Sequence, residues 1–327
     1  MRRRVGQGNL VEGLIGPTVG RNVTLDRIAT MLDWPALEAL LADLYASPTG
    51  RPSCPISLLL RALLLQVWHG LSDPAAEAVL SDRLSFRRFL GVSLDEPTHD
   101  HSTLWRFREA LAKRGLAHEL LAAVNAQLDR HGVILRTGTL IDATLIEANV
   151  SARNERRDGR PVDPDARWTR RGKRSVLGYK MHVAVDQGSG LVRAAVVTDA
   201  AVVTDAATHD VRPGPGLVQG DEAMVTADKA YDSRAMRAAV DQAGAQDWVM
   251  HSARGRRRLK PWQTWMNRAV SPVRGAVERV FGTLKRSYRT RRARLWTGER
   301  NRVDLTMQVV AYNLRRAVVL MAKPAAL

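Results

Sequence analysis

Residues 179–198 read YKMHVAVDQGSGLVRAAVVT, and this stretch decides the fold class. Its first eight residues alternate in polarity and are rich in β-formers, which favours a strand. The QGSG segment at 187–190 is typical of a hairpin turn, and residues 191–198 have the composition of the returning strand. We therefore predict an antiparallel hairpin that belongs to a larger sheet.

Outward from this hairpin, short β-rich segments alternate with helical ones. A helix that ends near Gly244 carries a C-terminal stop signal. Such an order predicts an α/β fold, in which helices pack on a mixed sheet. The other expected elements are strands at 137–142, 223–227 and 248–251, and helices at 233–243, 273–288 and 303–321.

The N-terminal part has a different pattern. In residues 24–132 apolar side chains recur at helical spacing and runs of β-branched residues are few, so we predict an all-α module there. Thr24 and Ser102 are expected helix N-caps, and residues 56–68 form the most apolar helix. The predicted domains are an arm at 1–23, a helical module at 24–132 for DNA-end recognition or dimerisation, a catalytic domain at 133–320, and a tail at 321–327.

Composition excludes several classes of protein. The 327 residues are 45% apolar and 25% charged, which are globular values. We find no secretory signal and no apolar run long enough to span a bilayer, so we expect no membrane partner. Cys54 is the only cysteine, which rules out a disulfide framework. We expect a cytoplasmic protein.

The positive charge is concentrated in two segments. The net charge is +17, yet residues 1–150 hold 16 basic and 16 acidic side chains, a net charge of zero. Residues 151–180 hold 10 and 4 (net +6), and residues 251–300 hold 15 and 2 (net +13). In the second segment the charges are interleaved with aromatics such as Trp262 and Trp265, which favours nucleic-acid binding over a solvated tail. For 151–174, which we predict to be a loop, a solvated face is the alternative.

Three acidic residues on separate elements could perform phosphodiester chemistry. Asp142 is expected at the end of the first strand, Asp228 at the end of the fourth, and Glu278 within a helix. Divalent ions that activate and stabilise phosphodiester oxygens are held by a few such carboxylates. If the two strands are neighbours, Asp142 and Asp228 meet at one edge of the sheet. Glu278 has an alternative role as an ion-pair partner of Arg274, four residues earlier.

The helix that carries Glu278 is amphipathic. At about 100° per residue, Val277, Val280, Phe281 and Leu284 form one apolar stripe. Arg274, Glu278 and Lys285 fall together along the border of that stripe. We expect the stripe to pack on the sheet while the three charged residues line its margin.

Other candidate ligands are less convincing. Glu147, Asp186 and Asp232 lie near the strands, but solvent exposure or capping explains each of them. His182 and His209 have no second histidine at ligand spacing, and His182 is expected to face the strand that bears Asp142. No phosphate-binding glycine loop follows a strand, so no nucleotide cofactor is expected.

The spacing of Arg274, Glu278 and Lys285 resembles the signature around the third acid in bacterial DDE transposases of the insertion-sequence four and five groups. Further blocks resemble those of the same family in the same order, and the resemblance extends from about residue 50 to 318. These blocks are HDHSTLWRFR at 99–108, DATLIEA at 142–148, GYKMH at 178–182, THD at 208–210 and DKAY at 228–231.

The resemblance implies a ribonuclease-H-like catalytic domain that uses two Mg²⁺ or Mn²⁺ ions. Such enzymes cut double-stranded DNA at the terminal inverted repeats of their element and join the 3′-hydroxyl to target DNA, generally as homo-oligomers on DNA. By position, Asp142, Asp228 and Glu278 would be the catalytic metal ligands. The expected DNA contacts are Arg274, Lys285 and Tyr231 from the resemblance, and Lys173, Arg174, Arg254, Arg256, Arg257, Arg258 and Arg286 from the basic segments.

Two features depart from the family pattern. Ser271 stands where the family often has an aromatic residue, and AVVTDA at 195–200 is repeated at 201–206. We interpret the repeat as a six-residue insertion that lengthens a loop. The alternatives to an active transposase are an inactive or domesticated DNA-binding copy and a related nuclease that cuts without joining.

Overall fold

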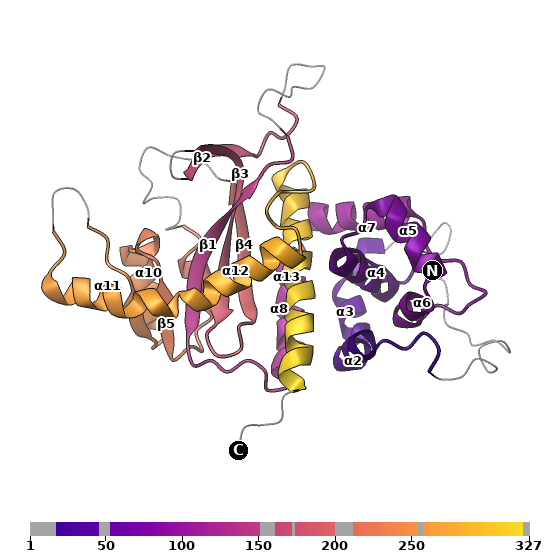
Figure 1. Ribbon diagram of the computed structural model, residues 1–327, viewed down its shortest axis with the longest axis horizontal. Coiled ribbons are helices and arrows are strands. Elements are labelled where there is room, and N and C mark those ends of the chain that lie inside the picture. The colour runs from indigo at the N-terminus through magenta and orange to yellow at the C-terminus, as the bar shows by residue number, and fades with distance from the viewer. Residues whose placement is uncertain are drawn as a thin grey trace. The chain divides into compact units, whose positions relative to one another are not determined.

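The computed structural model describes residues 18–45, 53–150, 161–171, 174–199, 212–253 and 258–322 (Figure 1). The chain forms two compact units. The first contains the residues up to His131 and those from Thr306 onward, and the second contains Gly132–Leu305. The later part of the last helix therefore groups with the N-terminal helices rather than with the sheet. Within the described ranges, we find no helix with the length and apolarity needed to cross a membrane.

Helices build the first unit, as predicted. Asn22 caps its first helix by accepting a hydrogen bond from the Leu25 amide (3.1 Å), and Asp100 caps a later one through Thr103 (2.6 Å). The expected caps at Thr24 and Ser102 were therefore wrong, because a better-placed side-chain oxygen lies two residues earlier in each case. The elements are α2 (Val23–Met31), α3 (Trp34–Leu40), η1 (Ala42–Tyr45), α4 (Ile56–His69), α5 (Asp73–Asp82), α6 (Leu84–Leu90), α7 (His101–Arg114) and α8 (Ala117–Asp129).

The second unit is built on a six-stranded mixed sheet with the order β2-β3-β1-β5-β6, in which β4 also pairs with β3. β3 is antiparallel to its three partners, whereas β1, β5 and β6 run parallel. The mixed sheet with flanking helices agrees with the predicted α/β fold class. The strands are β1 (Thr139–Glu147), β2 (Arg167–Arg171), β3 (Arg174–Asp186), β4 (Val192–Asp199), β5 (Met224–Ala227) and β6 (Gln246–Val249).

The predicted hairpin is present as β3 and β4, but β3 is longer than expected. It begins at Arg174 because β2, in a segment predicted to be a loop, pairs with its first five residues. Gly178 explains one residue of the GYKMH block. A Cβ atom at this position would lie 2.0 Å from the carbonyl oxygen of Ile146 on β1, so only glycine allows the two strands to pair here.

Helices follow and cover the sheet. The predicted helices are α10, α12 and α13, with ends that differ by a few residues, whereas α11 and the two short 3₁₀ turns η2 and η3 were not predicted. The first residue of α11 is a proline, which is a signal for a helix start. These elements are η2 (Pro215–Leu217), η3 (Lys229–Tyr231), α10 (Arg234–Gln242), α11 (Pro261–Val273), α12 (Gly275–Ser287) and α13 (Gly298–Met321).

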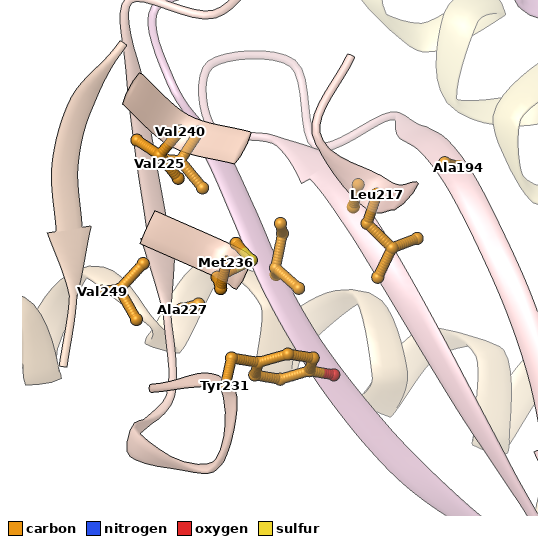
Figure 2. Packing of buried hydrophobic residues seen from close by; sticks show 10 residues of the cluster. Ala194, Leu217, Val225, Ala227, Tyr231, Met236, Val240 and Val249 are labelled. Atoms are coloured by element: carbon orange, nitrogen blue, oxygen red, sulfur yellow. The ribbon is translucent and has the colours of Figure 1, made fainter. Parts of the chain in front are cut away.

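One face of the sheet forms a core with α10 and the turn that follows β5 (Figure 2). Met236 and Val240 of α10 lie against Val225 and Ala227 of β5, and all four are fully buried. Tyr231 closes the cluster below them. Because β5 is held between neighbouring strands and this core, the residue that follows it, Asp228, leaves the sheet at a fixed point.

Candidate active site

Asp142 and Asp228 are brought together by the parallel pairing of β1 and β5. Ile141 pairs with Ala227, so the two acidic residues follow paired positions of adjacent strands. This confirms that the first and fourth predicted strands are neighbours. Asp142 is not at the end of its strand, however, because β1 continues to Glu147 along β3.

Arg274 connects the two carboxylates. Its Nη2 atom lies 2.9 Å from Oδ2 of Asp142 and 3.3 Å from Oδ2 of Asp228. Arg274 stands at the junction of α11 and α12, and the three side chains are only 14–27% exposed. Sequence reasoning placed Arg274 on DNA phosphate and did not anticipate this bridge, which depends on tertiary structure.

Burial and the ion pairs with Arg274 shift the pKa values of Asp142 and Arg274. Burial raises the pKa of Asp142, and Arg274 opposes this by its charge and hydrogen bond. Burial works to lower the pKa of Arg274, but Asp142, Asp228 and Glu278 together raise it above its ordinary value. Two carboxylates therefore share one guanidinium nitrogen, which leaves an excess of negative charge at this edge of the sheet.

Glu278 lies one turn beyond Arg274, in the first turn of α12. Its side chain is exposed, while its amide donates to the carbonyl oxygen of Arg274 (3.3 Å). In the described part of the chain, no three acidic, histidine or cysteine side chains are grouped so that they could hold a metal ion. The structure thus pairs Asp142 with Asp228 and leaves Glu278 outside that pair.

The apolar stripe of α12 holds these residues in place. Val277, Val280, Phe281 and Leu284 are its buried residues, as predicted, and α12 packs against β1. Lys285, on the margin of the stripe, donates a hydrogen bond to Oγ1 of Thr144. Thr144 is two residues beyond Asp142, on the same face of β1.

The predicted DNA-binding residues of the basic segments divide into those that the structure describes and those that it does not. Arg174, Arg258 and Arg286 are exposed, and Arg174 lies 4.0 Å from Glu147. The missed helix α11 adds two exposed aromatic side chains, Trp262 and Trp265, which are 54% and 65% exposed. Four predicted residues lie outside the described ranges, namely Lys173, Arg254, Arg256 and Arg257.

Tyr231 is placed differently from the expectation. Its side chain is 1% exposed, and its hydroxyl lies 2.8 Å from Nδ1 of His182. A buried ring cannot contact DNA from this position, because the turn after Asp228 folds its side chain into the core. His182 pairs with Ala143 and so faces β1 as predicted, whereas His209 lies outside the described ranges.

The competing acids have structural roles. Asp186 is buried and accepts hydrogen bonds from the Arg136 amide (2.8 Å) and from Ser189. Asp232 pairs with Arg237 at 2.8 Å. Glu147 is the last residue of β1. These contacts agree with capping and ion pairing rather than ligation.

Comparison with known proteins identifies the family. Residues 135–314 match the model described as Transposase DDE domain, and residues 16–110 match Transposase domain (DUF772). Among solved structures, a pre-cleavage Mos1 transpososome is 14% identical over 92% of this chain and 95% of that chain, with a TM-score of 0.21. A Mos1 paired-end complex with the left transposon end is 12% identical over 74% and 82%, with a TM-score of 0.18.

Similarity to solved structures at this level carries no weight in assigning fold or function. The DDE model, in contrast, spans more than half of the chain and includes all three predicted acids. The chain therefore belongs to the DDE transposase family, whose members are metal-dependent enzymes that cleave and join DNA.

Proposed function

We propose that this transposase belongs to the insertion-sequence four and five groups, and that Asp142, Asp228 and Glu278 are its catalytic acids. It would cleave the ends of its element and join the freed 3′-hydroxyl groups to target DNA. The observation that carries the proposal is the position of Asp142 and Asp228 on adjacent parallel strands, within reach of one guanidinium nitrogen.

The residues present suit a divalent cation. Carboxylate oxygens are the donors that Mg²⁺ and Mn²⁺ prefer, and Arg274 already meets a demand for positive charge between the two aspartates. Asp142 and Asp228 would hold the metal, with Glu278 as the third ligand. When bound, two such ions activate the attacking oxygen and stabilise the leaving oxygen of a phosphodiester.

Arg274 and Lys285 would hold the DNA backbone beside these acids. A guanidinium released from its carboxylates is suited to bind a phosphate through two parallel hydrogen bonds. Lys285 is anchored at Thr144, close along β1 to Asp142. Lys285 lies on α12 and Arg274 immediately precedes it, so packing of this helix on β1 sets their position relative to the acids.

The basic segments would supply the wider DNA surface. Arg174, Arg258 and Arg286 are exposed, and Trp262 and Trp265 add stacking surface on α11. Lys173, Arg254, Arg256 and Arg257 belong to the same segments in sequence. We further expect a homo-oligomer on paired double-stranded ends, acting in the bacterial cytoplasm.

Incubation of the purified protein with end DNA of its element and Mg²⁺ tests the proposal. We expect nicked ends and joined products, which separate a transposase from a nuclease. Glu278→Gln should abolish both products while end binding is retained. Glu299→Gln is the matched control, because Glu299 is an exposed acid in the first turn of α13 and should be dispensable. Cleavage by Glu278→Gln at the wild-type rate would remove Glu278 from the mechanism.

A further inference from the structure

A buried polar chain lies behind the proposed active site. His182 on β3 is fully buried, with Nδ1 at 2.8 Å from the hydroxyl of Tyr231 and Nε2 at 3.3 Å from Oγ1 of Thr198. The rings of His182 and Tyr231 meet edge to face, with centroids 6.0 Å apart. A buried polar side chain costs stability unless it is hydrogen-bonded, and here both ring nitrogens of His182 have a partner.

The direction of this chain follows from the hydrogens available. Thr198 has one hydroxyl hydrogen, and Oγ1 lies 3.0 Å from the carbonyl oxygen of Asp199, which can only accept. Oγ1 of Thr198 therefore accepts from the imidazole, which places the His182 proton on Nε2. Nδ1 is then the acceptor, and the Tyr231 hydroxyl donates to it. Burial lowers the pKa of His182 to about 3, so the ring is neutral, as this arrangement requires.

Tyr231 ends the single helical turn that begins at Asp228. Its amide donates to the carbonyl oxygen of Asp228 (2.9 Å), and the Asp228 carboxylate accepts from the Lys229 amide (2.5 Å). Because the hydrogen bond to His182 holds the Tyr231 side chain, the backbone of this turn can adopt few other conformations. The direction in which the Asp228 carboxylate leaves the sheet is thereby set.

His182 also lies beside the strand that carries Asp142. Its partner across the sheet is Ala143, the residue next to Asp142. The Ala143 amide in turn donates to Oδ1 of Asp142 (2.8 Å). His182 thus belongs to the strand that pairs with β1, and its ring bonds the turn that follows Asp228.

We propose that His182 and Tyr231 are positioning residues, whose hydrogen bond holds the Asp228 carboxylate beside that of Asp142. The inference rests on the proposed catalytic role of these two acids. It requires no contact between His182 or Tyr231 and DNA or metal. Loss of the bond would disturb cleavage but not DNA binding.

Tyr231→Phe is the sharpest variant, because it removes one hydroxyl and keeps the ring in the core. We expect single-turnover end cleavage at saturating DNA to slow by roughly ten- to a hundredfold, as for a small misplacement of a reacting group. The dissociation constant for end DNA should stay within about twofold of wild type, because the basic surface is untouched.

Tyr179→Phe is the matched control. Tyr179 is also 1% exposed on β3, and its hydroxyl donates to Oδ1 of Asp163 at 2.6 Å, away from the acid pair. Both variants lose a buried tyrosine hydroxyl and its hydrogen bonding, and both should lose thermal stability, but only Tyr231→Phe should slow cleavage. Equal slowing by both variants would overturn the inference, because it would show a general effect of destabilisation.

A second pair of variants tests the histidine. His182→Asn places an amide near the position of Nδ1 and should recover part of the rate lost in His182→Ala. The double variant Tyr231→Phe/His182→Ala should cleave no more slowly than His182→Ala alone, because both changes break one bond. Additive losses would contradict the proposal, and Tyr231→Phe decides it alone if the alanine variant does not fold.

A spectroscopic measurement separates failure of this inference from failure of the proposed function. In protein labelled with ¹⁵N-histidine, His182 should show an unprotonated Nδ1 and a protonated Nε2, and Tyr231→Phe should shift the Nδ1 signal. A wild-type protein that does not cleave end DNA would count against the proposed function. Wild-type cleavage at a rate matched by Tyr231→Phe would overturn the positioning role.

Discussion

Two clusters of acids and arginines in the second unit differ in their charge balance. In the balanced cluster, Asp221 lies between Arg136 (2.6 Å) and Arg193, and Glu222 lies 3.7 Å from Arg193. Two acids there meet two guanidinium groups.

In the acid pair, Asp142 and Asp228 share Nη2 of Arg274, and the charge of Glu278 also reaches that arginine. The comparison teaches that ion pairing alone does not mark a site. What distinguishes the acid pair, among the described residues, is that two carboxylates and the charge of Glu278 converge on one arginine, and such an arrangement favours an added cation.

The largest expected difference between the clusters is in catalysis. Asp228→Asn should lower end cleavage by about a thousandfold or more, because it removes one of the carboxylates that would hold the divalent ion. Asp221→Asn breaks an ion pair of similar type and should leave the rate nearly unchanged. The measurement is the single-turnover cleavage rate with Mg²⁺. A similar loss of cleavage rate in both variants would show that the acid pair and the balanced cluster do not differ in catalysis.

The affinity for a metal ion should change on loss of Arg274 but not on loss of an arginine from the balanced cluster. Arg274→Gln removes the resident cation, so Mn²⁺ should bind about tenfold more tightly without DNA, the equivalent of one charged hydrogen bond. Cleavage should nevertheless fall, because a phosphate contact is lost.

Arg193→Gln is the control and should leave Mn²⁺ affinity unchanged. Titration calorimetry or Mn²⁺ electron paramagnetic resonance gives the affinities. Weaker Mn²⁺ binding by Arg274→Gln would show that the arginine does not occupy the cation position.

Salt dependence should separate paired arginines from those that face solvent. Replacement of Arg258 and Lys260 together by alanine should weaken binding to any DNA. It should also reduce the slope of log affinity against log salt by about two, because two phosphate contacts are lost. Arg136→Ala should have little effect, because Arg136 is engaged by Asp221. Fluorescence anisotropy over a salt series measures both quantities. If the slope is unchanged in the double variant, Arg258 and Lys260 do not contact DNA phosphates.

The smallest expected effect is on stability. Asp221 is partly buried, which would raise its pKa, but hydrogen bonds and charges from Arg136 and Arg193 outweigh this and lower it. Its carboxylate therefore stabilises the fold above its unfolded pKa, and this contribution is lost as pH falls through the lower folded value. Because the side chain is 38% exposed, the contribution should be below about 1 kcal/mol.

Urea unfolding of wild type and Asp221→Asn tests this pH dependence. The variant should be less stable at pH 7, and the two proteins should converge as the solution is made more acidic than the ordinary aspartate pKa. A difference that persists in acid would assign the effect to packing rather than to the ion pair.

The predictable parts of the fold were those with local signals. The turn signal at 187–190 correctly predicted the hairpin. Helical spacing alone identified all the buried residues of the α12 stripe. Asp142 and Asp228 could each be placed at the end of a short β-rich run, but their meeting was predicted only on the condition that the two strands are neighbours.

What sequence reasoning missed depends on tertiary contacts. β2 is a strand because β3 offers it an edge, and its arginine-rich sequence has no strand signal of its own. Asp142 lies within β1 because β3 continues the pairing past it. Tyr231 has an ordinary turn context, and only the core beneath the sheet shows that its ring is buried. Arg274 could be placed near Glu278 by spacing, but not between two acids from distant strands.

The most direct test of the account is anomalous diffraction from crystals of the protein soaked in Mn²⁺. We predict a manganese peak between the carboxylates of Asp142 and Asp228, with the Arg274 guanidinium displaced from both. An intact Arg274 bridge with no manganese at this position would contradict the assignment of these acids as the metal site.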